Sequence, residues 1–152
     1  MTAPTLSPHT RTRLALAIVV VALTALDLAL KAWAENTLGR NNAIDLGVID
    51  LRLTHNPGVA FGLGQALPAG ILLTITGIII AAIAAVAWRT ADDPALATAV
   101  GVILAGAAGN FIDRSVDGVV TDYLHTGWFP TFNGADTLIT LGAGALLLLT
   151  VR

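Results

Sequence analysis

Four apolar stretches separated by polar segments dominate the chain. They predict transmembrane helices at residues 14–34, 70–89, 95–112 and 136–151. Residues 70–88 carry no charge, and at about 1.5 Å of rise per residue they are long enough to cross a hydrocarbon core of roughly 30 Å. The second stretch is therefore the clearest transmembrane segment.

The third stretch repeats a small residue every four positions, at Ala97, Gly101, Ala105 and Gly109. Small residues at this spacing lie on one helix face and allow membrane helices to approach closely. A single span has no use for such a stripe. The pattern therefore predicts an all-α membrane bundle of four helices.

The first stretch also resembles a cleavable signal peptide, because Arg11 and Arg13 precede a long apolar run. Asp27 and Lys31 lie in its continuation, where no secretory cleavage site would carry them. We therefore expect a retained helix. The two residues form an i,i+4 pair on one face, and at their depth the pair is expected to face the bundle interior. A structural tie to the outer loops and a part in catalysis both remain open.

The fourth stretch is short, about 22 Å if it is helical from Thr137 to Val151. It can span a membrane only by extending back towards Asn133, by thinning the bilayer, or if Arg152 snorkels to the surface. Each of these solutions places Asp136 at the membrane surface or slightly below it.

Basic residues are divided evenly between the two sides, so the predicted orientation in the membrane depends on the first helix. Arg11 and Arg13 favour a cytoplasmic amino terminus. The predicted inner and outer sides then carry four basic residues each: Arg11, Arg13, Arg89 and Arg152 inside, and Lys31, Arg40, Arg52 and Arg114 outside. We expect a single multi-pass domain over residues 1–152 with both termini in the cytoplasm.

Two longer segments then lie outside. Residues 35–69 contain period-two alternation before and after Ile49, which predicts strands of a small extracytoplasmic sheet with a bulge or bend there. Residues 113–135 are polar and aromatic and include Gly127 and Pro130, so we expect a loop.

Composition supports a membrane location. The chain is 55% hydrophobic and 12% charged, whereas soluble domains carry about 25% charged residues. The net charge of −2 and the lack of a basic patch argue against nucleic-acid binding. The chain has no cysteine, which excludes disulfides, thiolate metal sites and a cysteine nucleophile.

Four acidic residues lie in or beside the second outer segment, and a carboxylate near hydrocarbon is a functional candidate. Ordinary explanations exist for each one. Asp117 precedes a glycine in a turn-like step, Asp113 can pair with Arg114, Asp136 can cap the fourth helix, and Asp122 would be unexceptional in a strand or loop.

Chemistry favours Asp122 and Asp136 as a pair. Two neighbouring carboxylates do not both ionise easily, so one keeps a proton while the other stays charged and can activate a water. No HExxH or GxSxG motif offers different machinery. His9, His55 and His125 are scattered and are interpreted as polar loop residues. No metal or organic cofactor is expected.

Four blocks carry a family resemblance: DLALK at 27–31, NPGVAFG at 56–62, AGAAGNFIDR at 105–114, and VTDYL followed by FNGAD, which contain Asp122 and Asp136. In this order, on this arrangement of helices, the chain resembles the lipoprotein signal peptidases (signal peptidase II). The resemblance covers nearly the whole chain. Departures from the usual family pattern are Leu28, Ala107 and Ala108, and the early end of the fourth helix at Arg152.

The resemblance implies a membrane aspartic endopeptidase with Asp122 and Asp136 as catalytic residues and Asp113 in a structural role. Its implied substrates are prolipoproteins whose lipobox cysteine carries diacylglyceryl, cleaved just before that cysteine, with the outer sheet acting as a cradle. The remaining residues implied to line, brace or support the site are Asp27, Lys31, Asn56, Gly106, Asn110, Arg114, Asn133 and Ala135.

We further hypothesise that Arg114 stabilises the substrate backbone or a developing oxyanion. The site is expected on the extracytoplasmic face of a bacterial cell membrane, and a monomer surrounded by membrane lipids suffices for two aspartates.

Two alternative functions remain open for the chain. A small transporter predicts inverted repeats and acids at the midplane, and an inactive membrane scaffold predicts loss of an aspartate.

Overall fold

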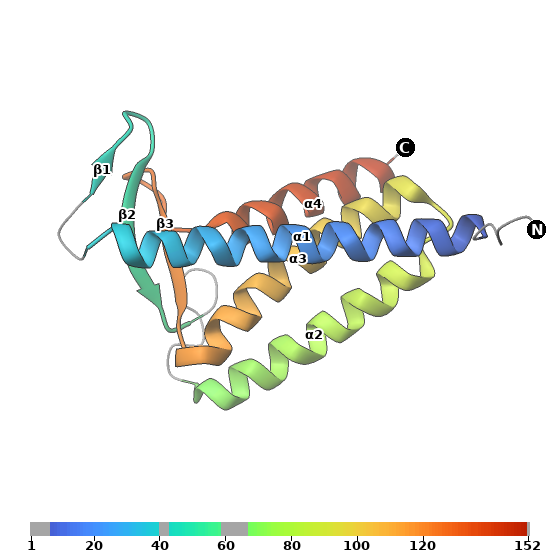
Figure 1. Cartoon of the computed structure of the whole chain (residues 1–152), viewed down its shortest axis with the longest axis horizontal. Helices are drawn as coiled ribbons and strands as arrows, with labels where there is room; N and C mark the ends of the chain where they lie inside the picture. The colour runs from blue at the N-terminus through green and yellow to red at the C-terminus, as the bar shows by residue number, and fades with distance from the viewer. Residues whose placement is uncertain (1–6, 40–42, 59–66, 152) are drawn as a thin grey trace, which may run out of the picture.

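The computed structural model describes residues 7–39, 43–58 and 67–151. Four helices lie roughly along one direction, with both termini at one end and a small sheet across the other (Figure 1). In chain order, the elements are α1 (Pro8–Thr37), β1 (Ile44–Asp45), β2 (Asp50–Asn56), α2 (Ala69–Arg89), α3 (Pro94–Asp117), β3 (Val120–His125) and α4 (Gly134–Thr150).

Three of the four helices, α1, α2 and α3, are long and apolar enough to cross a membrane. Helix α4 is apolar but has 17 residues, so it is shorter than the others, as the sequence indicates. Large apolar side chains such as Val21, Ile78 and Leu148 are exposed on the outer faces of the helices. Lipid can cover these faces, and the protein needs little apolar core between the helices.

Helix α3 is central and packs against α1, α2 and α4. The predicted small-residue stripe is confirmed, because its residues are buried and face α1. An ideal Cβ on Gly101 would collide with Leu16, and one on Gly109 would lie 2.5 Å from Asp27 Oδ2. Further along this contact, Thr24 Oγ1 donates to the Ala105 carbonyl at 3.1 Å.

Two glycines of α4 test how closely it packs on α3. An ideal Cβ on Gly142 would lie 2.9 Å from the Ala99 carbonyl oxygen, whereas one on Gly144 would meet nothing within 4 Å. We expect Gly142→Ala to lower the free energy of unfolding by about 1–3 kcal/mol. The matched change Gly144→Ala should be neutral or stabilise by up to about 1 kcal/mol. Thermal unfolding in detergent measures both, and equal stabilities would contradict the packing.

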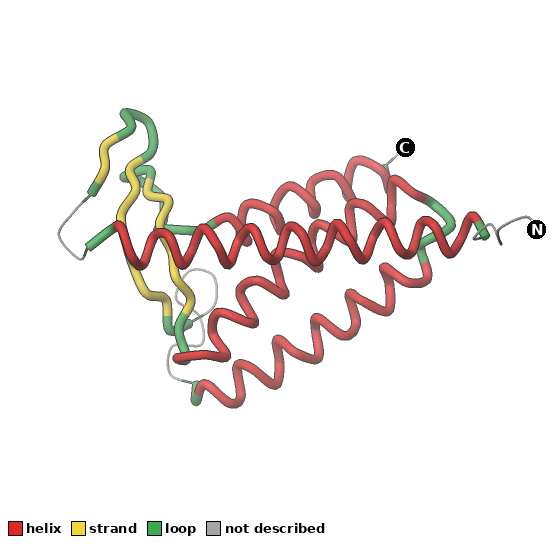
Figure 2. The backbone as a smooth tube through the Cα atoms, viewed as in Figure 1, coloured by secondary structure: helices red, strands yellow, loops and turns green. Residues whose placement is uncertain are grey.

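The strands form one antiparallel sheet in the order β1-β2-β3, as seen in Figure 2. The predicted bend near Ile49 is a chain reversal, in which the Leu46 N–H donates to the Ile49 carbonyl at 3.2 Å and Gly47 has a φ of 91°. The alternation on either side therefore belongs to two paired strands, and the register irregularity lies instead between Leu51 and Thr54.

The prediction of a loop over residues 113–135 is wrong in two places. Helix α3 continues to Asp117 and ends at Gly118, whose φ of 89° suits a glycine C-cap. Strand β3 follows and pairs with β2. Its first four residues are all buried, so the alternation that would reveal a half-exposed strand is missing.

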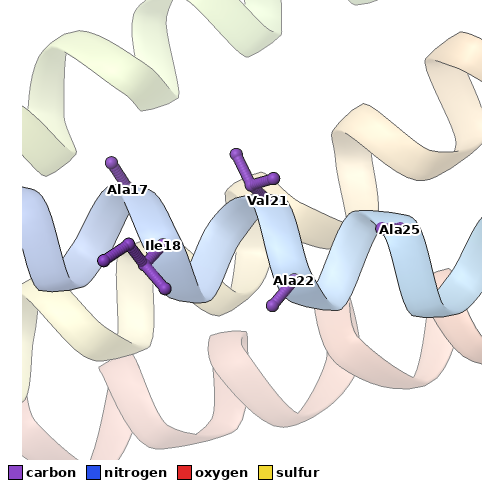
Figure 3. Close-up of a pocket in the computed structure, with 5 residues that line it drawn as sticks. All are labelled: Ala17, Ile18, Val21, Ala22 and Ala25. Carbon is purple, nitrogen blue, oxygen red and sulfur yellow. The ribbon is translucent and has the colours of Figure 1, made fainter.

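Helix α1 also carries an open apolar groove of about 380 Å³ (Figure 3). None of its lining side chains can donate or accept a proton, so we place no chemistry there. The lining residues are Ala17, Ile18, Val21, Ala22 and Ala25.

Candidate active site

Asp122 lies in the middle of β3 and is 2% exposed. Pairing of β3 with β2 sets Asp122 opposite Thr54 and brings Asn56, at the end of β2, close to it. The side-chain amide of Asn56 donates to Asp122 Oδ2 at 3.4 Å, and that of Asn133 donates to Oδ1 at 2.7 Å. Both oxygens of this buried carboxyl therefore have an amide donor.

A return of the chain to β3 brings Asn133 to this position. Phe132 forms an isolated antiparallel bridge with Leu124, and Asn133 follows directly as the N-cap of α4. Asn133 Oδ1 accepts from the Asp136 N–H at 2.9 Å, and the Asn133 N–H donates to Asp136 Oδ2 at 3.3 Å. This reciprocal capping box fixes the first turn of α4 beside β3.

Asp136 thus has a structural role as the third helical residue of the capping box, while the cap itself is Asn133. Its other oxygen, Oδ1, accepts from Asn110 Nδ2 of α3 at 2.8 Å. Asp122 and Asp136 are therefore both hydrogen-bonded to Asn133, from its side chain and from its backbone respectively. The fold brings the two predicted catalytic aspartates to one place.

Burial is the main influence on the ionisation of Asp122. It raises the pKa of this carboxyl from 3.8 to about 7, with the nearby charge of Asp136 as the second cause. Hydrogen bonds from Asn133 and Asn56 and the charge of Lys31 act in the opposite direction. Asp122 is consequently able to hold a proton near neutral pH.

Asp27 and Lys31 lie in the bundle interior, as predicted, and each is 2% exposed. Lys31 Nζ lies 3.2 Å from Asp27 Oδ2 and 3.1 Å from Asp113 Oδ2, and it donates to Asn110 Oδ1 at 2.7 Å. Asp27 also lies close to the start of α4, where an ideal Cβ on Gly134 would be 3.1 Å from Asp27 Oδ1. The pair connects α1 to the site.

Gly106 of α3 packs closely against Ala135 in the first turn of α4. An ideal Cβ on Gly106 would collide with the Ala135 carbonyl oxygen and would lie 2.9 Å from Ile139 Cγ1. Ala135 is fully buried. These two residues bring Asn110, one turn further along α3, within reach of Asp136.

Arg114 is 5% exposed and lies at the same end of α3. One of its terminal nitrogens donates to the Gly58 carbonyl, while its Nε has no hydrogen-bond partner among the described residues. Of the block at 56–62, residues 59–62 lie outside the described part of the chain. Arg114 therefore braces the beginning of that block.

Two other acids of the cluster have separate partners. Asp113 accepts from the Thr121 backbone N–H at 2.8 Å as well as pairing with Lys31. Asp117 is exposed and accepts from the Val119 N–H at 3.2 Å. The first acid joins α3 to β3, and the second belongs to the turn that ends α3.

Sequence reasoning missed two neighbours of the site, both in β3. The Tyr123 hydroxyl accepts from the Gly134 N–H at 3.2 Å, and burial raises the pKa of this phenol. Thr121 Oγ1 donates to Glu35 of α1 at 3.0 Å. The block VTDYL contains both residues, but only the strand assignment would have shown that they face the helices.

The histidines with described side chains lie in strands, not in loops. His55 of β2 pairs with Glu35 at 2.7 Å, and His125 ends β3, where its ring contacts Thr131. The side chain of His9 lies outside the described part. The described residues contain no group of three or more side chains that could hold a metal ion.

Comparisons with known proteins agree with this architecture. The family model for signal peptidase (SPase) II matches residues 19–152. A lipoprotein signal peptidase of Rhodococcus jostii is 33% identical over 147 residues, 91% of this chain and 73% of the relative. One of Brucella ovis is 36% identical over 136 residues, 86% of this chain and 85% of the relative.

Two solved structures of bacterial membrane enzymes share the fold. At 24% sequence identity each, they superpose with TM-scores of 0.79 and 0.76. The first alignment covers 90% of this chain and 87% of the solved one, and the second covers 91% and 93%. With the family model and the relatives above, the chain therefore belongs to the signal peptidase II family and is a bacterial membrane peptidase of lipoprotein processing.

Proposed function

We propose that the chain is an aspartic endopeptidase that removes signal peptides from diacylglyceryl-modified prolipoproteins, with a water activated by Asp122 and Asp136. The observation that carries this proposal is the double role of Asn133. Its side chain donates to Asp122 at 2.7 Å while its backbone N–H donates to Asp136 at 3.3 Å. One residue thus holds two carboxyl groups at one site.

The pair needs one proton to work. Asp122 holds it, because burial disfavours the charged form, while Asp136 accepts N–H donors that suit a carboxylate. Asp136 takes a proton from water as the water oxygen attacks the scissile carbonyl carbon, and Asp122 donates its proton to the carbonyl oxygen. When the tetrahedral intermediate collapses, the C–N bond breaks, the proton on Asp136 passes to the leaving amine, and Asp122 recovers its own.

The pH dependence follows from that proton. Because the pKa of Asp122 is raised to about 7 in the folded chain, kcat/KM is expected to fall as pH rises through about 7. The apparent pKa of this fall belongs to the pair of aspartates and not to Asp122 alone. The stabilising contribution of protonated Asp122 is likewise complete below pH 3.8 and lost as pH rises towards 7. Initial rates between pH 5 and 9 test the predicted fall in kcat/KM, and a kcat/KM that stays constant from about pH 6 to 9 would contradict it.

The membrane placement supports this chemistry. We propose that all four helices span, with both termini in the cytoplasm and the sheet outside. The termini lie at the end opposite the sheet (Figure 1), and α4 with its 17 residues measures about 25 Å. A helix this short holds Asp136 near the membrane surface, where a cysteine anchored by diacylglyceryl presents its peptide bond.

The other predicted site residues support the pair from one chain, so a single monomeric domain suffices. Arg114 and Asn110 of α3 are proposed to bind the substrate backbone. Asn56, Gly106 and Ala135 hold the elements around the pair. Membrane lipid surrounds the helices, and the sheet supports the substrate from outside.

A comparison of two substrates tests the proposal. The purified chain in detergent is given one prolipoprotein precursor, either modified with diacylglyceryl or unmodified. We expect cleavage of the modified precursor and at least about 100-fold slower cleavage of the other, because remote binding energy of the lipid contributes to the reaction. Equal rates would contradict the assigned substrate class, and no cleavage of either would contradict the peptidase activity.

A further inference from the structure

Asn110 connects a buried cation to one of the two aspartates. Its Oδ1 accepts from Lys31 Nζ at 2.7 Å, and its Nδ2 donates to Asp136 Oδ1 at 2.8 Å. The two ends of this amide therefore face groups of opposite character. The end that accepts faces an ammonium, and the end that donates faces a carboxylate.

A rotation of this amide by half a turn would reverse both contacts. The amide oxygen would then face the Asp136 carboxylate, and the amide N–H groups would face the ammonium of Lys31. Both arrangements bring like groups together, because a carboxylate only accepts and an ammonium only donates. As long as Lys31 is in place, Asn110 has one favourable orientation.

Asn133 cannot fix this orientation alone. Its Nδ2 lies 3.1 Å from Asn110 Oδ1, but it also lies 2.7 Å from Asp122 Oδ1 and 3.3 Å from the Thr121 carbonyl. An amide nitrogen carries two hydrogens, so three acceptors compete for them. The shortest of these contacts is to Asp122, so Asn110 shares the second hydrogen with the Thr121 carbonyl, and Lys31 at 2.7 Å is the shorter donor to Asn110 Oδ1.

Lys31 is itself held in place. It is 2% exposed, and Asp27 and Asp113 lie on either side of its ammonium at 3.2 Å and 3.1 Å. Leaving this position would separate one buried ion pair, with Asp27, and one partly buried pair, with Asp113, which is costly. The cation that orients Asn110 therefore has a fixed position of its own.

We propose that Lys31 is a positioning residue, which acts through Asn110 to keep an N–H donor on Asp136. This inference rests on the proposed function, in which Asp136 activates the water. Removing Lys31 takes away the shorter of the two donors to Asn110 Oδ1 and leaves only the shared amide of Asn133. The Asn110 amide is then held less firmly, and its hydrogen bond to Asp136 loses its fixed geometry. Within the part of the chain that the structure describes, Lys31 contacts Asp27, Asp113 and Asn110 and neither aspartate of the pair.

A direct effect of the Lys31 charge is the competing explanation, since that charge also acts on Asp122. Among the described residues, the charged or polar groups that act on Asp136 are Asn110 and Arg114 of α3, Asn133 at the start of α4, and Asp122 and Tyr123 of β3. The charge effect does not need Asn110. Removing Asn110 therefore separates the two explanations.

The first measurement is hydrogen exchange of the Asn110 side-chain NH₂ in D₂O by NMR, with the resonance assigned by its loss in Asn110→Ala. In Lys31→Met we expect exchange on the order of 10-fold faster, because the amide oxygen loses its ammonium donor and the N–H bond to Asp136 is no longer held in place. Unchanged exchange would overturn the proposal. This readout requires no catalysis, so it stands even if the proposed function fails.

The second measurement is single-turnover cleavage, corrected for the folded fraction. Lys31→Met should slow the wild type by about 10-fold to 100-fold, as expected for a displaced catalytic group, but slow Asn110→Ala by less than about twofold. An equal loss in both backgrounds would overturn the proposal in favour of the direct charge. If Asn110→Ala shows no cleavage, the exchange measurement decides.

Two further variants control for folding. Thr24→Val removes another contact between α1 and α3 away from the aspartates, so it should leave both readouts unchanged. If Lys31→Met does not fold, Asp27→Asn/Lys31→Met removes the buried pair together and takes its place in both measurements. If Asp136→Asn cleaves at the wild-type rate, the proposed function fails, whatever the exchange result.

Discussion

Replacing either Asp122 or Asp136 by asparagine is expected to lower kcat by at least about 10³-fold. General acid–base catalysis contributes roughly 10²–10⁴-fold for each group, and groups that act as a unit are lost together. The double variant should therefore be little slower than either single one. Asparagine keeps the size of the side chain, so Asp122 loses its proton and Asp136 its charge with little change in packing.

Folding of these variants is checked by thermal unfolding in detergent. Asp122→Asn removes a carboxyl whose charged form is disfavoured by burial, and one neighbouring amide must turn to accept the new N–H, so we expect only a small change in stability at neutral pH. Asp117→Asn is the matched control, because Asp117 is an exposed aspartate at the end of α3 and should retain wild-type activity. Wild-type kcat in one of the two pair variants would show that the pair is chosen wrongly.

Asn133→Ser is expected to lower kcat by about 10²–10³-fold while the chain stays folded. Serine can still cap α4, but it loses the amide that donates to Asp122 at 2.7 Å. Loss of one fixed donor in an active site commonly has an effect of this size. Initial rates and thermal unfolding of the same preparation measure both properties.

Asn133→Ala separates the two roles of this residue further. It removes both the cap and the donor, so its rate should match that of the serine variant. Its free energy of unfolding should be about 1 kcal/mol lower than that of the serine variant. Wild-type activity in the serine variant would show that Asn133 serves the helix alone. The observation that carries the proposed function would then be lost.

The helices could be predicted because their determinants are local. Apolar length and small-residue spacing indicated α2 and α3, and the burial of Ala97 and Ala105 follows from that spacing. The burial of Asp27 and Lys31 could be expected for the same reason, since a charge pair within an apolar helix needs a polar interior. The short fourth helix was also apparent from its composition.

The sheet and its link to the site could be predicted only in part. Strand β3 is buried on its first four residues and shows no alternation, and its pairing with β2 depends on residues more than 60 positions away. The return of Phe132 to Leu124 depends on the same strand, which the sequence did not show. The Lys31–Asn110 contact joins residues 79 positions apart, so no local pattern could have shown it.

The bond that the purified wild-type chain cleaves in a diacylglyceryl-modified prolipoprotein tests the central claim most directly. Mass spectrometry of the products identifies that bond. We predict one new amino terminus, at the lipid-bearing cysteine, together with the intact signal peptide. Cleavage at any other bond, or a precursor that stays intact with folded protein in excess, would contradict the account.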